Sequence, residues 1–547
     1  MPVALFINSA ATTAEPGVTL FDAAERIGLL VPSSCHKQGK CRECLIEVTA
    51  GMECLTPRAP EEGHLRGGFR LACRCAVAAA SGRVTGHLLG RAALRIETAA
   101  VNLPAGPAGA RPDPAVTRAG DRILLDGEEI ARGFGPLHGI AIDVGTTTVV
   151  ARAIDLETGA IAGTASFENP QRFGGSDVMA RIQFDTDHPG RLLQRTLLGY
   201  LARAVADLPV DPGSIYEYVV AGNSTMRDLF FGLDVHSIGQ RPYWSVTQRE
   251  LAEGRRAGTS LAVSARTLRL PGHPRARVYG LPLVGGHVGA DAAACLLAIE
   301  PQRCGRLVAI MDIGTNTELF LGNRDRLLAA SCPAGPAFEG GAITCGMPGL
   351  DGAIERVAIA DDGRVATRVI GGGRPAGICG SGLIDLLGEL LRTGRMNAFG
   401  RFENGEDAFV VDAGAGIVFR ESDVNELAQA KGANVAGLQI VAQRYGCPLD
   451  DIEVFYLAGG FGRHIDVGAA RRIGLIPDLP DGRIVPVGNL AIEGASIALL
   501  SVSRRRELEA QVRSIAHVEL ETDPNFFDHF VAGCQFRPIG SGREGGA

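Results

Sequence analysis

The sequence contains one motif twice, and this repeat constrains the fold more than any other feature. Residues 138–150 read as an apolar strand, a polar Asp-Val-Gly-Thr-Thr-Thr turn and a second apolar strand. Residues 308–320 repeat this plan around Asp-Ile-Gly-Thr-Asn-Thr. A single segment of this kind is an ordinary hairpin signal, whereas two of them indicate duplicated halves that face each other. We therefore expect an α/β body with two related lobes.

The two polar turns carry the residue types that bind phosphate. Glycine lets the backbone approach a ligand, threonine hydroxyls and backbone amides donate to phosphate oxygens, and each aspartate can hold Mg²⁺ or its waters. The pattern thus predicts a phosphate clamp between the halves. The candidate residues are Asp143, Gly145, Thr146, Thr147 and Thr148 in the first turn, and Asp312, Gly314, Thr315, Asn316 and Thr317 in the second.

A third segment is suited to the nucleoside part of a nucleotide. Residues 454–462 form a strand of the buried type, Val-Phe-Tyr-Leu-Ala, that ends in Gly-Gly-Phe-Gly. A turn without side chains leaves room for a flat ring and its ribose. Gly459 and Gly460 are the candidate contacts, although a strand end of this kind is common on its own.

Cysteine placement predicts a metal centre near the N-terminus. The chain has 13 cysteines, and six of them lie in its first 75 residues. Cys35, Cys41 and Cys44 follow a C-x5-C-x2-C pattern, and Cys73 comes 29 residues later. Soft thiolates from one tight loop and one distant strand can hold two irons. The alternative is a zinc tetrahedron closed by C-x2-C and C-x-C, with Cys41, Cys44, Cys73 and Cys75 as ligands.

The segments around the cysteines predict a small sheet followed by a linker. Residues 3–7 and 45–48 have the apolar character of strands, and residues 21–27 have a short helical repeat. Residues 103–114 are rich in proline and glycine, which sustain neither a helix nor a central strand. Residues 122–130 then predict a short hairpin before the large body.

Charge and hydropathy exclude several classes of protein. The net charge of -7 argues against a nucleic-acid-binding body. The longest apolar stretch, near residues 497–500, is far shorter than a membrane span and has Glu493 close by. The N-terminus lacks the basic start and apolar run of an export signal, and many cysteines without such a signal indicate reduced thiols or metal ligation in the cytoplasm. We expect a cytoplasmic protein without a membrane or nucleic-acid partner.

The N-terminal segment resembles the [2Fe–2S] ferredoxin domain of the β-grasp type, with the adrenodoxin-like five-residue first gap. In that family the fourth ligand lies in an Arg-Leu-x-Cys segment, which Arg70-Leu71-Ala72-Cys73 matches. The resemblance implies that Cys35, Cys41, Cys44 and Cys73 hold the cluster. Cys75 is then a bystander, and its substitution for Cys73 is the open alternative.

The three nucleotide motifs together resemble the superfamily of acetate and sugar kinases, heat-shock chaperones and actin, over roughly residues 138–535. This resemblance implies two α/β lobes that close over Mg-ATP. It places Asp143 and Asp312 near the metal, the turn threonines near the phosphates, and Gly459 and Gly460 beside the adenosine.

The whole chain resembles the reductive activators of corrinoid proteins, which couple a ferredoxin domain to this ATPase body. Glycine-containing polar segments at residues 169–178, 220–226, 333–341 and 377–385 narrow the family further. The resemblance implies an ATP-hydrolysing protein that passes an electron from its cluster to Co(II) of a corrinoid protein in a methyltransferase system and so restores Co(I). It also implies an upstream electron donor, and it allows a homodimer.

The expected divisions are a ferredoxin-like domain at 1–88, a linker with a short hairpin at 89–137, and an actin-like ATPase at 138–547 with lobes of about 138–300 and 301–547. Two departures from the resemblance are expected. Only Cys534 lies near the C-terminus, which excludes the activators with extra clusters there, and an additional middle domain of longer relatives is expected to be missing. No residue is assigned as a general base.

Three other functions fit the same motifs. One is an ATP-dependent hydrolase or small-molecule kinase whose ferredoxin domain senses redox state. Another is a nucleotide switch that transfers no electron. The third keeps the redox role and changes the acceptor to another low-potential metalloenzyme. The ferredoxin segment favours the redox functions, because a bare kinase has no use for four thiolates.

Overall fold

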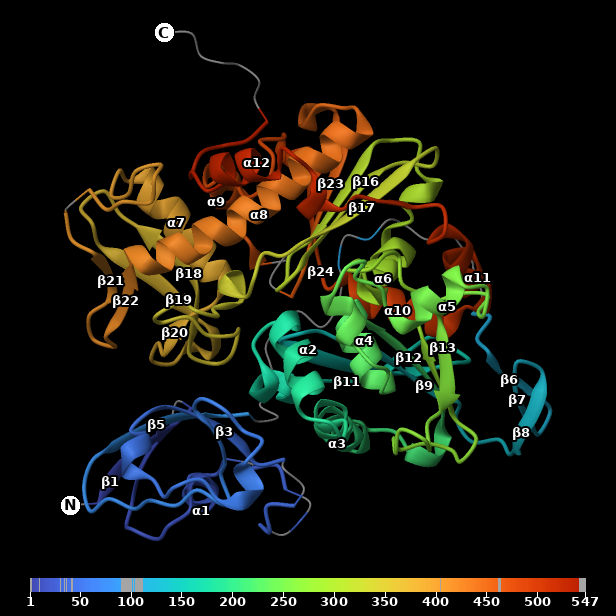
Figure 1. The fold of residues 1–547 in the computed structure, drawn as a ribbon, viewed down its shortest axis with the longest axis horizontal. Helices are drawn as coiled ribbons and strands as arrows, with labels where there is room; N and C mark the ends of the chain where they lie inside the picture. Colours follow the sequence, from blue (N-terminus) through green and yellow to red (C-terminus); the bar gives the residue numbers. More distant parts are fainter. Residues whose placement is uncertain are drawn as a thin grey trace.

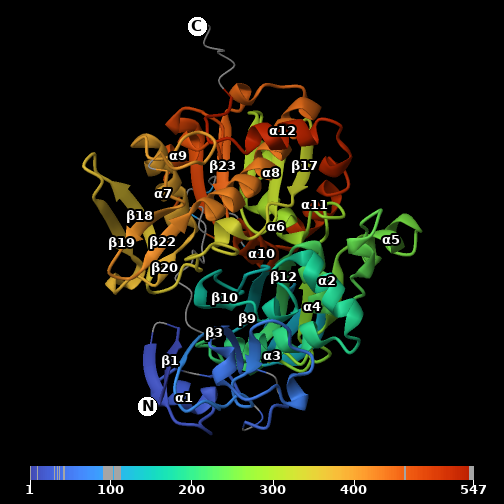
Figure 2. The same cartoon turned by 60° about the vertical axis from the view of Figure 1, so that its left-hand side comes forward.

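The computed structural model describes the chain except for residues 1, 9, 30, 34, 36, 41–42, 90–100, 102, 104–111, 404, 461–463 and 541–547. Figure 1 shows an N-terminal domain, in blue, beside a larger body whose first lobe is green and whose second lobe runs from yellow to red. Figure 2 shows the N-terminal domain next to α3 and the first lobe from a second side.

The N-terminal domain is a five-stranded sheet in the order β2-β1-β5-β3-β4 with one helix packed on it. Side chains of β1 alternate between buried and half-buried, as expected for a strand with one face on a core. The helix begins after Thr19, whose hydroxyl oxygen accepts from the Asp22 amide at 3.0 Å. The elements are β1 (Val3–Ile7), β2 (Ala10–Ala14), α1 (Leu20–Arg26), β3 (Leu45–Ala50), β4 (Phe69–Leu71) and β5 (Arg83–Leu88).

A small antiparallel sheet follows the linker. The expected hairpin is present as β7 (Arg122–Leu125) and β8 (Glu128–Arg132). A third strand, β6 (Val116–Ala119), pairs with β7 as well. The linker expected at residues 103–114 lies mostly outside the described residues.

The first lobe is built on a six-stranded sheet in the order β11-β10-β9-β12-β14-β13. Every side chain of the repeat strand β9 (His138–Val144) is buried, which explains its continuous apolar character. The other strands are β10 (Thr148–Asp155), β11 (Ile161–Glu168), β12 (Ile215–Gly222), β13 (Leu261–Ser264) and β14 (Arg277–Gly280). The helices are α2 (Val178–Asp187), α3 (Leu192–Ala206), α4 (Ser224–Phe231), α5 (Val246–Ala252) and α6 (Ala290–Ile299).

The second lobe is built on a six-stranded sheet in the order β24-β23-β15-β16-β17-β25, with two smaller sheets, β19-β18-β20 and β21-β22. Its central strands are β15 (Val308–Asp312), β16 (Thr317–Gly322), β17 (Leu327–Cys332), β23 (Val454–Ala458), β24 (Ile484–Gly488) and β25 (Ala516–His517). The smaller sheets hold β18 (Ala353–Ile359), β19 (Val365–Val369), β20 (Gly377–Ile378), β21 (Ala408–Asp412) and β22 (Ile417–Arg420). The helices are α7 (Gly380–Arg392), α8 (Glu421–Tyr445), α9 (Val467–Arg472), α10 (Leu490–Leu500), α11 (Val502–Gln511) and α12 (Phe526–Gly533).

The two large sheets share one topology, which confirms the expected duplication. In each, a repeat hairpin continues into a third antiparallel strand, as β9-β10-β11 and as β15-β16-β17. A parallel strand lies on the other side of the first hairpin strand, β12 beside β9 and β23 beside β15. The fold is therefore the predicted one: a β-grasp ferredoxin-type domain followed by a two-lobed α/β body.

The C-terminal segment returns to the first lobe. Figure 1 shows α10 and α11, in red, among the green elements. Helix α10 packs on α6, β9 and β12. Buried apolar side chains of α6, α10, β9 and β15 belong to one cluster, which joins the two lobes. No helix in the described ranges is long and apolar enough to cross a membrane.

The N-terminal domain is seated on the first lobe. The hydroxyl of Tyr200 in α3 contacts the backbone carbonyls of Glu43 and Leu89. Arg203, also in α3, donates from Nη1 to the Ser33 carbonyl at 3.1 Å. Since Ser33 precedes Cys35 and Glu43 directly precedes Cys44, α3 contacts the cysteine loop near both of its ends.

Two ion pairs add to this interface. The Nε2 of His87 in β5 lies 2.7 Å from Oε2 of Glu168 at the end of β11. Arg172 of the first lobe donates from Nη2 to Oε2 of Glu47 in β3 at 3.1 Å, and it also pairs with Glu168. The interface therefore contains a four-residue chain of alternating charge.

Candidate nucleotide and cluster sites

A cavity opens between the two lobes where the repeat strands end. Both repeat turns, the end of β23, the start of α10 and the loop after β17 line it. Every nucleotide-site candidate except one is among the lining residues: Asp143, Gly145, Thr146, Thr147, Thr148, Asp312, Gly314, Thr315, Asn316, Gly459 and Gly460. The duplication thus brings residues from three distant segments to one place.

Thr317 is the exception: it is absent from the lining of the cavity. It is fully buried at the start of β16. Side chains alternate along a strand, so its neighbour Glu318 points to the cavity instead. Strand β16 begins at Thr317, so the second repeat turn ends at Asn316.

Aspartates from the two lobes lie near one another in this cavity. Burial raises the pKa of Asp143 to about 7 and that of Asp312 to about 6. Asn489 donates from Nδ2 to Oδ2 of Asp143 at 2.9 Å, and the Cys295 thiol donates to Oδ2 of Asp312 at 3.3 Å. Asp291, at the start of α6, also lines the cavity, and burial raises its pKa to about 7. Carboxylates gathered in this way suit a divalent cation with phosphate and water as its other ligands.

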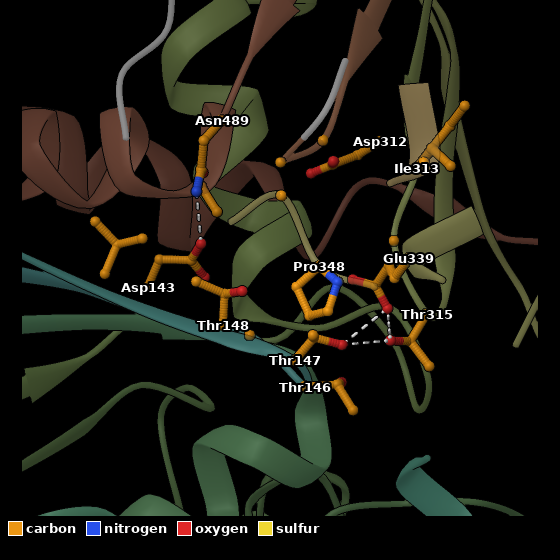
Figure 3. Close-up of a pocket in the computed structure, with 18 of the residues that line it drawn as sticks. Asp143, Thr146, Thr147, Thr148, Asp312, Ile313, Thr315, Glu339, Pro348 and Asn489 are labelled. Atoms are coloured by element: carbon orange, nitrogen blue, oxygen red, sulfur yellow. Dashed lines mark hydrogen bonds between the residues drawn. The ribbon is translucent and has the colours of Figure 1, made fainter. Parts of the chain in front are cut away.

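Glu339 lies beside Thr147 and Thr315, across the view from Asp143 (Figure 3). Its Oε2 accepts a hydrogen bond of 2.9 Å from Oγ1 of Thr147 and another from Oγ1 of Thr315. The two threonine oxygens are 3.5 Å apart. One carboxylate therefore connects the two repeat turns across the cleft.

The backbone at Gly459 explains the glycine pair. Gly459 has φ +119, and a Cβ built on it would lie 2.2 Å from the carbonyl oxygen of Ile313. Only glycine permits this approach between the end of β23 and the second repeat turn. Phe461 and Gly462, which complete the motif, lie outside the described residues.

The first repeat turn is hydrogen-bonded to the segment after β11, which also contacts the N-terminal domain. Asn169 donates from its side-chain Nδ2 to the Gly145 carbonyl at 2.8 Å and from its backbone N–H to the Thr147 carbonyl at 2.7 Å. The buried guanidinium of Arg181 donates from Nη2 to the Thr146 carbonyl at 2.7 Å. The turn backbone is thus held from behind by the segment after β11.

Sequence reasoning missed Asp291, Asn489 and the role of Glu339. Asn489 directly follows the parallel strand β24, and its Oδ1 caps α10 by accepting from the Ile492 amide. An asparagine between an apolar strand and a helix is a sequence signal that could have indicated this residue. Asp291 follows a glycine-rich loop at a helix start. Nothing in the sequence near Glu339 indicated that its carboxylate would reach both turns.

Three cysteines of the N-terminal domain converge, as expected for a cluster. Sγ of Cys44 lies 3.3 Å from Sγ of Cys73, close enough for both sulfurs to bind one metal ion. The contact with Cys44 lowers the pKa of Cys73, and the nearby charge of Cys35 opposes this shift. Cys41 lies outside the described residues. Within the described part of the chain, no three acidic, histidine or cysteine side chains form a complete metal site.

A buried ion pair positions the strand that carries Cys73. Arg70 donates from Nε to Oε1 of Glu62 at 2.8 Å, and both side chains are almost fully buried. The same oxygen accepts the Leu71 amide at 2.8 Å. Burial raises the pKa of Cys75 to about 12, and this thiol lies on the side of the Arg70–Glu62 pair. The cysteine that faces Cys44 is therefore Cys73.

Three family models match consecutive parts of the chain. The 2Fe-2S iron-sulfur cluster binding domain matches residues 6–78, the RACo middle region matches residues 138–303, and the C-terminal domain of RACo, the ASKHA domain, matches residues 306–541. The middle-region match covers the segment that forms the first lobe. The expectation that the chain lacks a middle domain is therefore wrong.

Named relatives and a solved structure agree with these models. The corrinoid activation enzyme RamQ of Eubacterium limosum is 33% identical over 73% of this chain and 70% of its own length. The [Co(II) methylated amine-specific corrinoid protein] reductase of Methanosarcina barkeri is 26% identical over 72% of this chain and 76% of its own. A solved structure of a reductive activator for a corrinoid, iron-sulfur protein covers 98% of both chains with a TM-score of 0.72 and 27% identity.

Proposed function

Because the chain belongs to the family of reductive activators of corrinoid proteins, we propose that it uses ATP to drive an electron onto Co(II) of a partner corrinoid protein. The product is the Co(I) form that a corrinoid methyltransferase system needs. The observation that carries this proposal is the union of a [2Fe–2S] ferredoxin domain with an ASKHA ATPase body in one chain.

The residues support separate roles for the two sites: the cysteines for electron transfer and the cavity between the lobes for nucleotide binding. Cys35, Cys41, Cys44 and Cys73 would hold the [2Fe–2S] cluster, and a cluster there supplies one-electron transfer. The threonines of the repeat turns would bind the phosphates, and Asp143 and Asp312 would hold Mg²⁺ or its waters. Gly459 and Gly460 would leave space for the adenosine.

ATP is needed because the electron moves uphill. A ferredoxin-type cluster is a weaker reductant than the Co(II)/Co(I) couple requires. For one electron, about 60 mV corresponds to about 1.4 kcal/mol, so a gap of a few hundred millivolts costs several kcal/mol. The nucleotide cycle would offset this cost by changing which docked state of the corrinoid protein is stable, and closure of two lobes over a nucleotide is a general means of doing so.

Finer points belong to the same proposal. We assign residues 1–88 to the ferredoxin domain, 89–137 to the linker with its small sheet, and 138–547 to the ATPase. An upstream reductant would refill the cluster, and a homodimer is compatible with the activity. A cytoplasmic location would keep the cluster thiolates reduced.

The decisive experiment is anaerobic ultraviolet–visible spectroscopy of a Co(II) corrinoid protein mixed with this protein and a reductant. Appearance of the Co(I) band only when Mg-ATP is added is the expected result. Equal reduction with and without ATP would contradict the role of the nucleotide. Absence of Co(I) with several corrinoid proteins, despite a reducible cluster, would favour a different low-potential acceptor. ATP turnover that needs no corrinoid protein would favour a kinase or hydrolase.

A further inference from the structure

The contacts of Glu339 set it apart from the other carboxylates of the cavity. Thr147 and Thr315 both donate to one oxygen of Glu339, and they come from opposite lobes. Phosphate and carboxylate oxygens accept hydrogen bonds from hydroxyls in the same way. Since these threonines are the proposed phosphate contacts, a terminal phosphate that takes over their hydroxyls would lie beside the Glu339 carboxylate.

Five other acidic side chains line the cavity, and none of their hydrogen bonds within the described part of the chain is to a threonine of the repeat turns: Asp143, Asp291, Asp312, Glu318 and Glu355. Asp143 accepts from Asn489, and Asp312 accepts from the Cys295 thiol. Oδ1 of Asp291 accepts from the Ala292 amide at 2.7 Å. Among the hydrogen bonds of the described residues, Glu339 is the carboxylate that contacts a threonine of the repeat turns. The cavity therefore has a group of aspartates and a separate carboxylate beside the threonine hydroxyls.

The surroundings of Glu339 suit a proton acceptor. Burial raises the pKa of Glu339, while the two threonine hydroxyls and the charges of Arg181 and Arg172 pull it back down. A carboxylate with a raised pKa is a stronger base than one at the surface. Arg181 is fully buried and adds positive charge behind the first repeat turn.

We propose that Glu339 is a catalytic residue of ATP hydrolysis, where it orients the attacking water and accepts its proton. The proposal rests on the proposed function in one respect, namely that ATP binds between these lobes. It assigns the water-positioning role, for which the sequence offered no candidate, to a loop of the second lobe.

The chemical step balances without any other reactant. The water oxygen forms a bond to the γ-phosphorus while the bond from that phosphorus to the β,γ-bridging oxygen breaks. The bridging oxygen keeps the electron pair and leaves as part of ADP. One water proton goes to the Glu339 carboxylate and then to solvent, and the other stays on the inorganic phosphate.

The test is the substitution Glu339→Gln in the full-length, cluster-loaded protein. Glutamine keeps the length of the side chain and an oxygen that the two threonines can donate to, but it does not accept a proton. Loss of a general base costs about 10²–10⁴-fold in rate, so kcat for ATP hydrolysis should fall by at least about 100-fold with and without a Co(II) corrinoid protein. The Kd of a non-hydrolysable ATP analogue should stay unchanged or decrease, because a negative charge next to the phosphates is removed.

Glu389→Gln is the matched control. Glu389 is a half-buried glutamate of the same lobe that accepts from the Ile359 amide at 2.9 Å and pairs with Arg392. It does not line the cavity, so its substitution should leave hydrolysis unchanged.

Two results would overturn the proposal: hydrolysis by Glu339→Gln at the wild-type rate, or a slower rate accompanied by equally weakened analogue binding and a lower melting temperature. The second pattern would indicate a structural latch. Failure of the proposed function looks different, because wild-type protein would then hydrolyse ATP without forming Co(I). Normal hydrolysis by the variant, with Co(I) formed, would contradict only the role of Glu339.

Discussion

Thr315 and Thr317 stand two positions apart in the same motif, yet they have opposite surroundings. Oγ1 of Thr315 donates to Glu339 in the cavity. Oγ1 of Thr317 is buried and has no hydrogen-bond partner among the described residues. A buried hydroxyl without a partner is unfavourable, and its replacement by a methyl group of the same shape can be neutral or stabilising.

We predict that Thr317→Val leaves the affinity for an ATP analogue unchanged and keeps or raises stability, by up to about 1 kcal/mol. Thr315→Val, the matched variant in the turn, should weaken binding, because it removes a donor to phosphate. Titration with a fluorescent ATP analogue and thermal denaturation measure both effects. A larger loss of affinity in Thr317→Val than in Thr315→Val would show that the turn has been read in the wrong register.

The sequence predicted part of the cavity lining by residue type, and Thr317 differs because side chains alternate along a strand. Asp143, Thr147 and Gly459 lie where a local motif places them, because a strand and its turn determine both position and direction. Glu339 and Asn489 could not be placed in this way. Their side chains reach the cavity only because separate elements pack together, and that packing is not encoded within a few residues.

At the scale of elements, the segment after β11 connects the two sites. Asn169 holds the first repeat turn, and its neighbour Glu168 pairs with His87 of the N-terminal domain. The 3₁₀ helix η3 (Pro170–Gly174) then supplies Arg172, which pairs with Glu47. If nucleotide binding moves the first repeat turn, the neighbouring residues Glu168 and Asn169 connect that movement directly to the N-terminal domain.

The His87–Glu168 pair makes this interface dependent on pH. Burial opposes the charged form of His87, but the negative charge of Glu168 outweighs it and raises the pKa of His87. Glu47 acts in the same direction and Arg172 in the opposite one. Burial likewise opposes the charge of Glu168, but His87 and Arg172 lower the pKa of Glu168 to about 2.

The sign of the dependence follows from the raised pKa of His87. The pair stabilises docking fully below the unfolded value of about 6.5, and this stabilisation is lost as pH rises through the folded pKa. Glu168 stays charged until pH falls toward about 2. We therefore predict that the N-terminal domain is held most tightly in mildly acidic solution and loosens above neutral pH.

Hydrogen exchange of β5 and β11, measured from pH 5.5 to 8.5, should report this loosening. His87→Ala should remove most of the pH dependence and weaken docking by about 1.5–3 kcal/mol, the usual value of a hydrogen bond to a charged group. His529→Ala, in the distant helix α12, serves as the control. An unchanged pH profile in His87→Ala would mean that other groups control the interface.

Helices and strands could be predicted where a short segment of sequence carries the apolar pattern that determines them. Both repeat hairpins, strand β23 and the first strand of the N-terminal domain are present where the sequence indicated them. The third strand beside the small hairpin was missed, because residues 116–119 are too short to show a period of their own. The parallel pairing of β12 with β9 depends on the whole lobe and has no signature within either strand.

At the scale of the whole molecule, the redox and nucleotide sites are built from separate parts of the chain. The cysteines lie in the N-terminal sheet domain, whereas the cavity is lined entirely by the lobes. Loss of the cluster should therefore leave nucleotide binding intact. This separation distinguishes an electron donor from a nucleotide switch that needs no cluster.

We predict that Cys73→Ser abolishes Co(I) formation and the visible absorption of the cluster, with an unchanged Kd for an ATP analogue. Cys75→Ser is the control and should keep the cluster, because Cys44 contacts Cys73, whereas Cys75 is fully buried near the charges of Arg70 and Glu62. Absorption and electron paramagnetic resonance spectra of the two variants decide the ligand. Cluster loss in Cys75→Ser with retention in Cys73→Ser would reverse the assignment.

The path of α10 has a consequence for how this protein is made. Asn489 contacts Asp143 and α10 packs on the first lobe, although 346 positions separate Asn489 from Asp143 in the sequence. A ribosome that has completed the first lobe has therefore not completed its half of the nucleotide site. A nascent or truncated chain that ends before Asn489 would have the first repeat turn without its partner asparagine. We expect such a chain to lack the hydrogen bond that holds the Asp143 carboxyl group in the complete fold.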